Sequence, residues 1–229
     1  MKINILTLYP EMFPGFLGYS LAGKALAENK CILNIVNIRD FATDKYKSVD
    51  DTPFGGGAGM VMKPDVLDAA IHATHTTGEI YYLSPRGQVF NQQIAHIWAQ
   101  TDEMTFICGR FEGIDERILE KWQIKEISIG DFILSGGEPA LLTMLDAVIR
   151  LLPAVMGNTQ SLNEESFENG LLEYPQYTKP QNWQGRLVPD VLVSGHHAKI
   201  NAWRLEQSIA LTQTRRPDLW TNYLAQKKD

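Results

Sequence analysis

The sequence predicts an α/β fold, with a mostly parallel sheet flanked by helices and a small, mainly helical C-terminal domain. Two observations carry this prediction. Over the first two-thirds of the chain, short apolar segments of β-rich composition alternate with segments of helical character, and this alternation is typical of parallel sheets. The pattern then stops at residues 153–170, a polar stretch bounded by Pro153 and Gly170, which predicts a linker.

Each predicted strand is a short apolar run, and the runs lie at residues 2–8, 32–38, 79–83, 104–108 and 126–129. Helices are expected between the strands, near residues 11–28, 64–77, 88–101 and 114–122. A strongly apolar helix is expected from Pro139 to Leu152, because proline suits a first helical turn and Pro153 stops the helix.

Two further helices are expected at about residues 197–213 and 217–227. The resulting domain prediction is an α/β domain over 1–155, a flexible linker or lid over 156–168, and a helical domain over 169–229.

Composition weighs against membrane and disulfide-rich proteins. No apolar run reaches the roughly 20 residues of a spanning helix, and Pro10 and Glu11 interrupt the N-terminal apolar stretch, which indicates a strand and turn and not a signal peptide. Cys31 and Cys108 are the two cysteines, too few for a disulfide framework, which favours the reducing cytoplasm.

The net charge of −6 weighs mildly against a general nucleic-acid binder, but the charge is unevenly distributed. Residues 170–229 hold eight Lys or Arg and five Asp or Glu, a net of +3, which leaves −9 on the first 169 residues. A basic C-terminal region permits a polyanionic partner without demonstrating one.

Three glycine-containing stretches follow predicted strands: LSPRG (83–87), CGRFEGIDER (108–117) and SIGDFILSGGEPA (128–140). Ligands of α/β proteins bind at the carboxyl ends of strands, and glycine allows a ligand to approach the backbone. The alternative is that each stretch is only a tight turn. A fourth glycine-rich stretch, DDTPFGGGAGM (50–60), has no strand directly before it.

Common nucleotide and metal motifs are missing. The chain has neither GxGxxG nor GxxxxGK[ST] spacing, which weighs against a Rossmann dehydrogenase or a P-loop enzyme. His196 and His197 are adjacent and have no evident third ligand, so no metal site is predicted.

Longer motifs run in order along almost the whole chain: LYPEMF (8–13), RDFATDKYKSVDDTPFGGGAGMVM (39–62), the three stretches above, LLPAVMGN (151–158), GLLEYPQYTKP (170–180) and VPDVLVSGHHAKI (188–200). Together they resemble the bacterial tRNA (guanine-N1)-methyltransferase (TrmD) family of the SPOUT, or trefoil-knot, class.

The resemblance implies methyl transfer from S-adenosylmethionine to N1 of guanosine 37, on the 3′ side of the tRNA anticodon. It also implies a C-terminal trefoil knot in the α/β domain, a homodimer with active sites at the subunit interface, an anticodon stem-loop partner and a Mg²⁺ requirement. The implied cofactor-binding residues are Ser84, Pro85, Gly109, Phe111, Glu112, Ser128, Ile129, Gly130, Phe132, Leu134, Gly136 and Gly137.

The implied catalytic residues are Glu165 and Arg150. A carboxylate would remove the N1 proton of guanine, and an arginine would stabilise the negative charge that then spreads onto the carbonyl oxygen. Glu165 stands where the family normally has aspartate, and read alone it would be an exposed linker residue. Read alone, Arg150 would pair with Asp146 on the same helix.

The implied substrate-binding residues are Gly57, Gly59, Lys179, Arg186, Arg204 and Arg215. Cations in the C-terminal region would contact RNA phosphates, and the alternative for each is an ordinary solvated surface. Two other functions stay open: a SPOUT methyltransferase for another RNA, and an RNA-binding homologue with weakened catalysis, the latter because of Glu165.

Overall fold

The computed structural model describes residues 1–157 and 164–227. The chain divides into two compact units, Met1–Gly157 and Asn158–Asp229. Residues 158–163 of the predicted linker lie outside the described residues, and the three-part domain division stays a prediction.

The first unit contains a five-stranded sheet in which every neighbouring pair is parallel. Its order is β2-β1-β6-β5-β7. The strands are β1 (Lys2–Thr7), β2 (Ile32–Asn37), β5 (Glu79–Val89), β6 (Glu103–Ile107) and β7 (Lys125–Ser128). Each predicted strand is present, and the predicted α/β class is confirmed.

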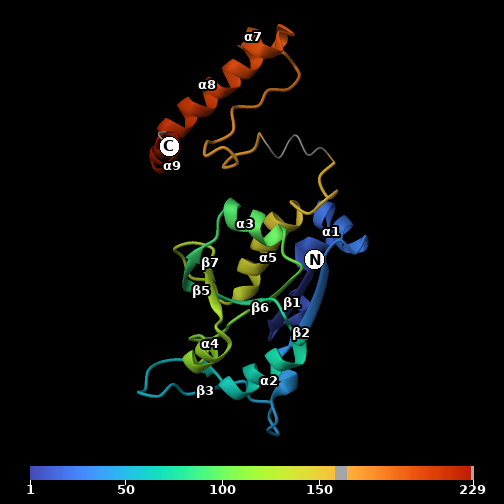
Figure 1. Ribbon diagram of the computed structural model, residues 1–229, viewed down its shortest axis with the longest axis vertical. Coiled ribbons are helices and arrows are strands. Elements are labelled where there is room, and N and C mark those ends of the chain that lie inside the picture. Colours follow the sequence, from blue (N-terminus) through green and yellow to red (C-terminus); the bar gives the residue numbers. More distant parts are fainter. Residues whose placement is uncertain (158–163, 228–229) are drawn as a thin grey trace. The chain divides into compact units, whose positions relative to one another are not determined.

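Helices cover both faces of the sheet (Figure 1). One face packs against α1 (Ser20–Ala27), α3 (Gln92–Ala99) and α5 (Gly137–Ile149), and the other against α2 (Pro64–Thr74) and α4 (Glu116–Trp122). Each face has its own cluster of buried apolar side chains, with Phe106 and Leu141 in one and Leu67 and Ile107 in the other. Burial of this apolar surface is the main stabilising contribution to the unit.

The helix expected over 11–28 is shorter than predicted. Residues Pro10–Met12 and Gly15–Gly18 form 3-10 turns, and only α1 is α-helical. Pro14 accounts for this difference, because it cannot donate the hydrogen bond that an interior helical position requires.

The sequence predicted that the LSPRG stretch (83–87) is a loop after a strand. In the structure it is an irregularity inside β5. Leu83 and Gln88 both align with Ile127 of β7, so residues 84–87 lie outside the ladder. A Cβ on Gly87 would lie 2.3 Å from the Ile127 nitrogen, so glycine is needed where the chain returns to β7. The helix expected over 88–101 therefore begins only at Gln92.

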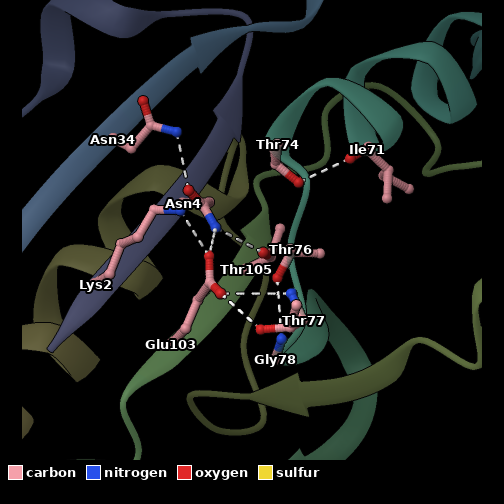
Figure 2. Close-up of polar contacts among 10 residues, drawn as sticks. All are labelled: Lys2, Asn4, Asn34, Ile71, Thr74, Thr76, Thr77, Gly78, Glu103 and Thr105. Carbon is pink, nitrogen blue, oxygen red and sulfur yellow. Dashed lines mark hydrogen bonds and ion pairs between the residues drawn. The ribbon is translucent and has the colours of Figure 1, made fainter.

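Polar side chains link the strands toward their amino ends (Figure 2). Asn4 of β1 accepts a hydrogen bond from Asn34 of β2 at 2.9 Å and donates to Glu103 and Thr105 of β6 at 3.0 and 3.2 Å. Glu103 also accepts hydrogen bonds from Lys2 and Thr77. This network satisfies polar groups that would otherwise be costly to bury.

The second unit has a much smaller apolar core. It contains a short hairpin of β8 (Asn182–Trp183) and β9 (Arg186–Leu187), followed by α7 (Asp190–Val193), α8 (His197–Arg215) and α9 (Pro217–Gln226). Among its described residues, the buried ones are Leu171, Ser208 and Thr212. Within the described parts of both units, no helix is long and apolar enough to cross a membrane.

Candidate functional site

A cavity of about 310 Å³ is lined by residues of the irregular part of β5 and of the two glycine-containing stretches that follow β6 and β7. Its size is in the usual range for small-molecule sites. Each residue that the resemblance assigned to the cofactor lines it: Ser84, Pro85, Gly109, Phe111, Glu112, Ser128, Ile129, Gly130, Phe132, Leu134, Gly136 and Gly137. The structure therefore brings together residues from three separate segments of the sequence.

Two of these glycines allow neighbouring chain segments to pack closely. A Cβ on Gly137 would lie 2.9 Å from the Cα of Cys108, and a Cβ on Gly109 would lie 2.5 Å from the Tyr82 ring. Both contacts are too short for a side chain to fit without movement. The sequence predicted that glycine lets a ligand approach the backbone at these positions. In the structure, Gly109 and Gly137 also let the chain segments that form the cavity walls pack against each other.

A buried ion pair connects two of the walls. Arg110, which follows β6, places Nη2 2.9 Å from Oε2 of Glu138 in the first turn of α5. The Glu138 side chain is fully buried and the Arg110 side chain is 16% exposed. Glu138 Oε1 also accepts a hydrogen bond from the Thr7 hydroxyl at 2.7 Å.

Arg110 also holds the stretch that precedes α5. Its Nη1 donates to the Ser135 carbonyl at 3.0 Å, and its guanidinium lies 4.3 Å from the centre of the Tyr9 ring. The contact with Glu138 lacks hydrogen-bond alignment, and the buried Nε has no hydrogen-bond partner among the described residues. The pair thus depends mainly on charge attraction, which is strong away from water.

Sequence analysis missed Arg110 and Glu138. The signal was present, because Glu138 is an acidic residue at the start of a strongly apolar helix, where a buried carboxylate requires a partner.

Burial, and secondarily the Glu138 carboxylate, raises the pKa of the Cys108 thiol well above its usual value. Cys108 therefore stays protonated, which excludes it as a thiolate nucleophile.

The glycine-rich stretch 50–60 leads into the cavity wall. It joins β3 (Asp50–Asp51) to β4 (Val61–Met62), and the Met60 carbonyl accepts a hydrogen bond from the Glu112 amide at 2.9 Å. A Cβ on Gly59 would lie 2.4 Å from Glu112 Oε1, whereas nothing lies within 4 Å of a Cβ on Gly57. Gly59 therefore contacts a cavity residue, and Gly57 is open to a partner.

The catalytic candidates belong to different units. Arg150 is the half-buried C-cap residue of α5, and its amide donates to the Asp146 carbonyl at 3.4 Å. A cation at this position also interacts favourably with the helix dipole. Glu165 lines a cavity of about 490 Å³ within the second unit, together with Glu164, Tyr174 and Arg204.

The predicted phosphate contacts differ in their surroundings. Lys179, Arg186 and Arg215 are exposed, and the Arg186 guanidinium lies 5.5 Å from the centre of the Trp183 ring. Arg204, by contrast, forms an ion pair with Glu164 at 3.3 Å.

Within the part of the chain that the structure describes, no group of three or more His, Cys, Asp or Glu side chains has the arrangement of a metal site. The cavity of the first unit has mixed chemistry instead. Apolar side chains such as Leu83, Ile129 and Phe132 form much of its wall, and the polar groups include Ser84 and Glu112.

The fold and this cavity define an α/β protein with a small-molecule site at the carboxyl ends of a parallel sheet. Comparison with known proteins is more specific. Residues 1–222 match the family described as tRNA (Guanine-1)-methyltransferase TrmD. The chain belongs to this family.

Proteins named tRNA (guanine-N(1)-)-methyltransferase are similar along almost their whole length. The relative from Rhodospirillum rubrum is 57% identical over 226 residues, which are 98% of this chain and 95% of the relative. The relative from Agrobacterium fabrum is 57% identical over 229 residues, 99% of both chains. The relative from Ruegeria sp. is 54% identical over 230 residues, 99% of this chain and 94% of the relative.

Proposed function

We propose that this protein transfers a methyl group from S-adenosylmethionine to N1 of guanosine 37, next to the tRNA anticodon on its 3′ side. The observation that carries the proposal is the convergence of the twelve expected cofactor residues on one cavity. Family membership supports the reaction type and the RNA substrate.

The chemistry of the cavity fits the proposed cofactor. Apolar walls suit an adenine ring, the Ser84 hydroxyl can donate a hydrogen bond, and the Glu112 carboxylate suits a cationic sulfonium or amino group. S-adenosylmethionine supplies an electrophilic methyl group when bound. The residues of this chain would bind it, orient it and exclude water.

In this proposal Glu165 is the general base. The N1 of guanine carries a proton and is a poor nucleophile until that proton is removed, so a carboxylate within hydrogen-bond reach would accept it. Arg150 would stabilise the negative charge that develops on the guanine carbonyl oxygen. Holding donor and acceptor in line supplies much of the remaining acceleration.

The partners follow from the same proposal. Lys179, Arg186 and Arg215 would contact phosphates of the anticodon stem-loop, because they are exposed cations. A homodimer with active sites at the subunit interface would cover apolar side chains such as Phe54 and Ile133, which are 100% and 79% exposed. A tRNA substrate places the proposed reaction in the cytoplasm. The proposed Mg²⁺ dependence is tested by measuring methyl transfer with and without a chelator of Mg²⁺.

Single-turnover methyl transfer to a tRNA transcript tests the proposed base. Glu165→Gln should slow the chemical step by on the order of 10²- to 10⁴-fold, while the affinity for S-adenosylmethionine stays near wild type. Glu165→Asp is the matched control that keeps a carboxylate, and it should retain most of the activity or gain some. An unchanged rate for Glu165→Gln would remove this residue as the base.

The same assay separates the competing functions. Transfer to a transcript whose guanosine 37 is replaced would favour a different RNA target. Cofactor binding without transfer to any transcript would favour an RNA-binding protein with lost catalysis.

A further inference from the structure

A cluster of three side chains in the second unit holds the chain next to Glu165. Glu164 accepts a hydrogen bond from Arg204 Nη1 at 3.3 Å, and the Tyr174 hydroxyl donates to the same Glu164 carboxylate oxygen. The Arg204 guanidinium also lies 4.7 Å from the centre of the Tyr174 ring, within the range of a cation–π interaction. Each of the three side chains therefore contacts the other two.

The other end of the same segment is attached to the same helix. Thr212, which is fully buried on α8, accepts a hydrogen bond from the Leu172 amide at 2.9 Å. Ser166, which lies between the two attachments, accepts a hydrogen bond on Oγ from the amide of Glu173, the residue after Leu172, at 2.9 Å. Residues 164–172 thus form a loop held at both ends by α8, and this loop carries Glu165.

We propose that Arg204 is a positioning residue that acts through Glu164 to orient Glu165, and not the phosphate contact that the sequence predicted. This inference rests on the proposed role of Glu165 as the base. The Arg204 side chain is 34% exposed, and its charge already faces a carboxylate. Arg204 lines the same cavity as Glu165. Because its guanidinium holds the Glu164 carboxylate, its loss would release the residue directly before the base.

The main test separates the chemical step from tRNA binding. Arg204→Gln should slow single-turnover methyl transfer by on the order of 10- to 100-fold, because a small displacement of a catalytic group has effects of that size. The dissociation constant for tRNA, and its dependence on salt, should stay near wild type. A phosphate contact would instead weaken tRNA binding and reduce the slope of log K against log salt by about 1, and that result would overturn the proposal.

Glu164→Gln distinguishes the two roles by the sign of its effect. If Arg204 positions the loop, removing its acidic partner slows the chemical step. If Arg204 contacts phosphate, Glu164→Gln frees a cation and tightens tRNA binding without slowing the reaction. Tyr174→Phe keeps the ring and removes only the hydroxyl contact, so a smaller loss in the same direction is expected and a folding defect is avoided.

Lys199→Gln is the matched control, because Lys199 is an exposed cation on the same helix. It should react at the wild-type rate, and a loss equal to that of Arg204→Gln would overturn the proposal by showing a general charge effect.

A double variant tests whether Arg204 acts through Glu165. Residues that act as a unit are not additive, so Arg204→Gln combined with Glu165→Gln should be no slower than Glu165→Gln alone. A further tenfold loss would overturn the positioning role. A wild-type rate in Glu165→Gln would overturn both the base and the positioning role, whereas a slow Glu165→Gln beside a wild-type Arg204→Gln would overturn only the latter.

Discussion

The two ends of the central sheet hold an acidic side chain in different ways. Toward the amino ends, Glu103 is 17% exposed and accepts hydrogen bonds from Lys2, Asn4 and Thr77. Beyond the carboxyl ends, Glu138 is fully buried and has Thr7 and Arg110 as its polar contacts. Strand β1 contributes to both arrangements.

This difference shows how one sheet holds a hydrogen-bonded polar network at one end and borders a cavity at the other. At the amino end three residues donate to the Glu103 carboxylate, which is also partly exposed to water. At the carboxyl end, Arg110 is the cation paired with Glu138, and the same guanidinium borders the cavity. Stability and cofactor binding should therefore be coupled at the carboxyl end and separate at the amino end.

The largest expected effect comes from breaking the buried pair. Arg110→Met leaves the Glu138 carboxylate buried without its cation, which should lower the free energy of unfolding by about 3–5 kcal/mol. It should also weaken the binding of S-adenosylmethionine, because Arg110 holds the Ser135 carbonyl at the cavity wall. Urea unfolding and titration calorimetry measure the two effects.

Lys2→Met is the matched control at the other end, where the cation is 45% exposed. It should cost less than about 1 kcal/mol and leave cofactor affinity unchanged. Equal losses of stability in the two variants would contradict the comparison.

An intermediate effect is expected from Glu103→Gln. The Lys2 ammonium, followed by the Asn4 amide and Thr77, lowers the pKa of Glu103 from 4.5 to about 2. A lowered pKa stabilises the fold above pH 4.5, and this contribution disappears as the pH falls toward 2. The variant should lose about 1–3 kcal/mol at pH 7, and its deficit should shrink across that interval.

Unfolding curves at several pH values measure this contribution. A deficit that did not change with pH would assign the loss to packing. Weaker cofactor binding in Glu103→Gln would show that the two ends are not independent.

The smallest expected effects come from a pair of isosteric substitutions. Thr7→Val removes a hydrogen bond to a buried carboxylate and the acceptor of the Tyr9 amide, and it should cost at least about 1.5 kcal/mol, whereas Thr105→Val should cost about 0.5–1 kcal/mol. Thr105→Val costs less because the Asn4 amide, which donates a hydrogen bond to Thr105, also donates one to Glu103 and keeps that partner. A reversed order in chemical denaturation would show that Glu138 does not depend on Thr7.

Local patterns predicted the regular elements well. The apolar runs at 2–8 and 32–38 became β1 and β2, and Pro153 lies shortly after the end of α5, as expected of a helix-stopping residue. The irregular part of β5 was missed, because its return to the sheet depends on contact between Gly87 and the distant Ile127. The β3–β4 hairpin was missed for a similar reason, since its strands contain two residues each.

The sequence by itself determined the α/β class, the approximate order of strands and helices, and, through its long motifs, the family and the residues expected around the cofactor. These properties are encoded by neighbouring residues or by motif identity. Only the tertiary structure decided that Arg110 pairs with Glu138 and that Arg204 pairs with Glu164. Each pair joins residues separated by tens of positions, and whether two charges meet depends on the packing that brings them together and on how much water it leaves between them.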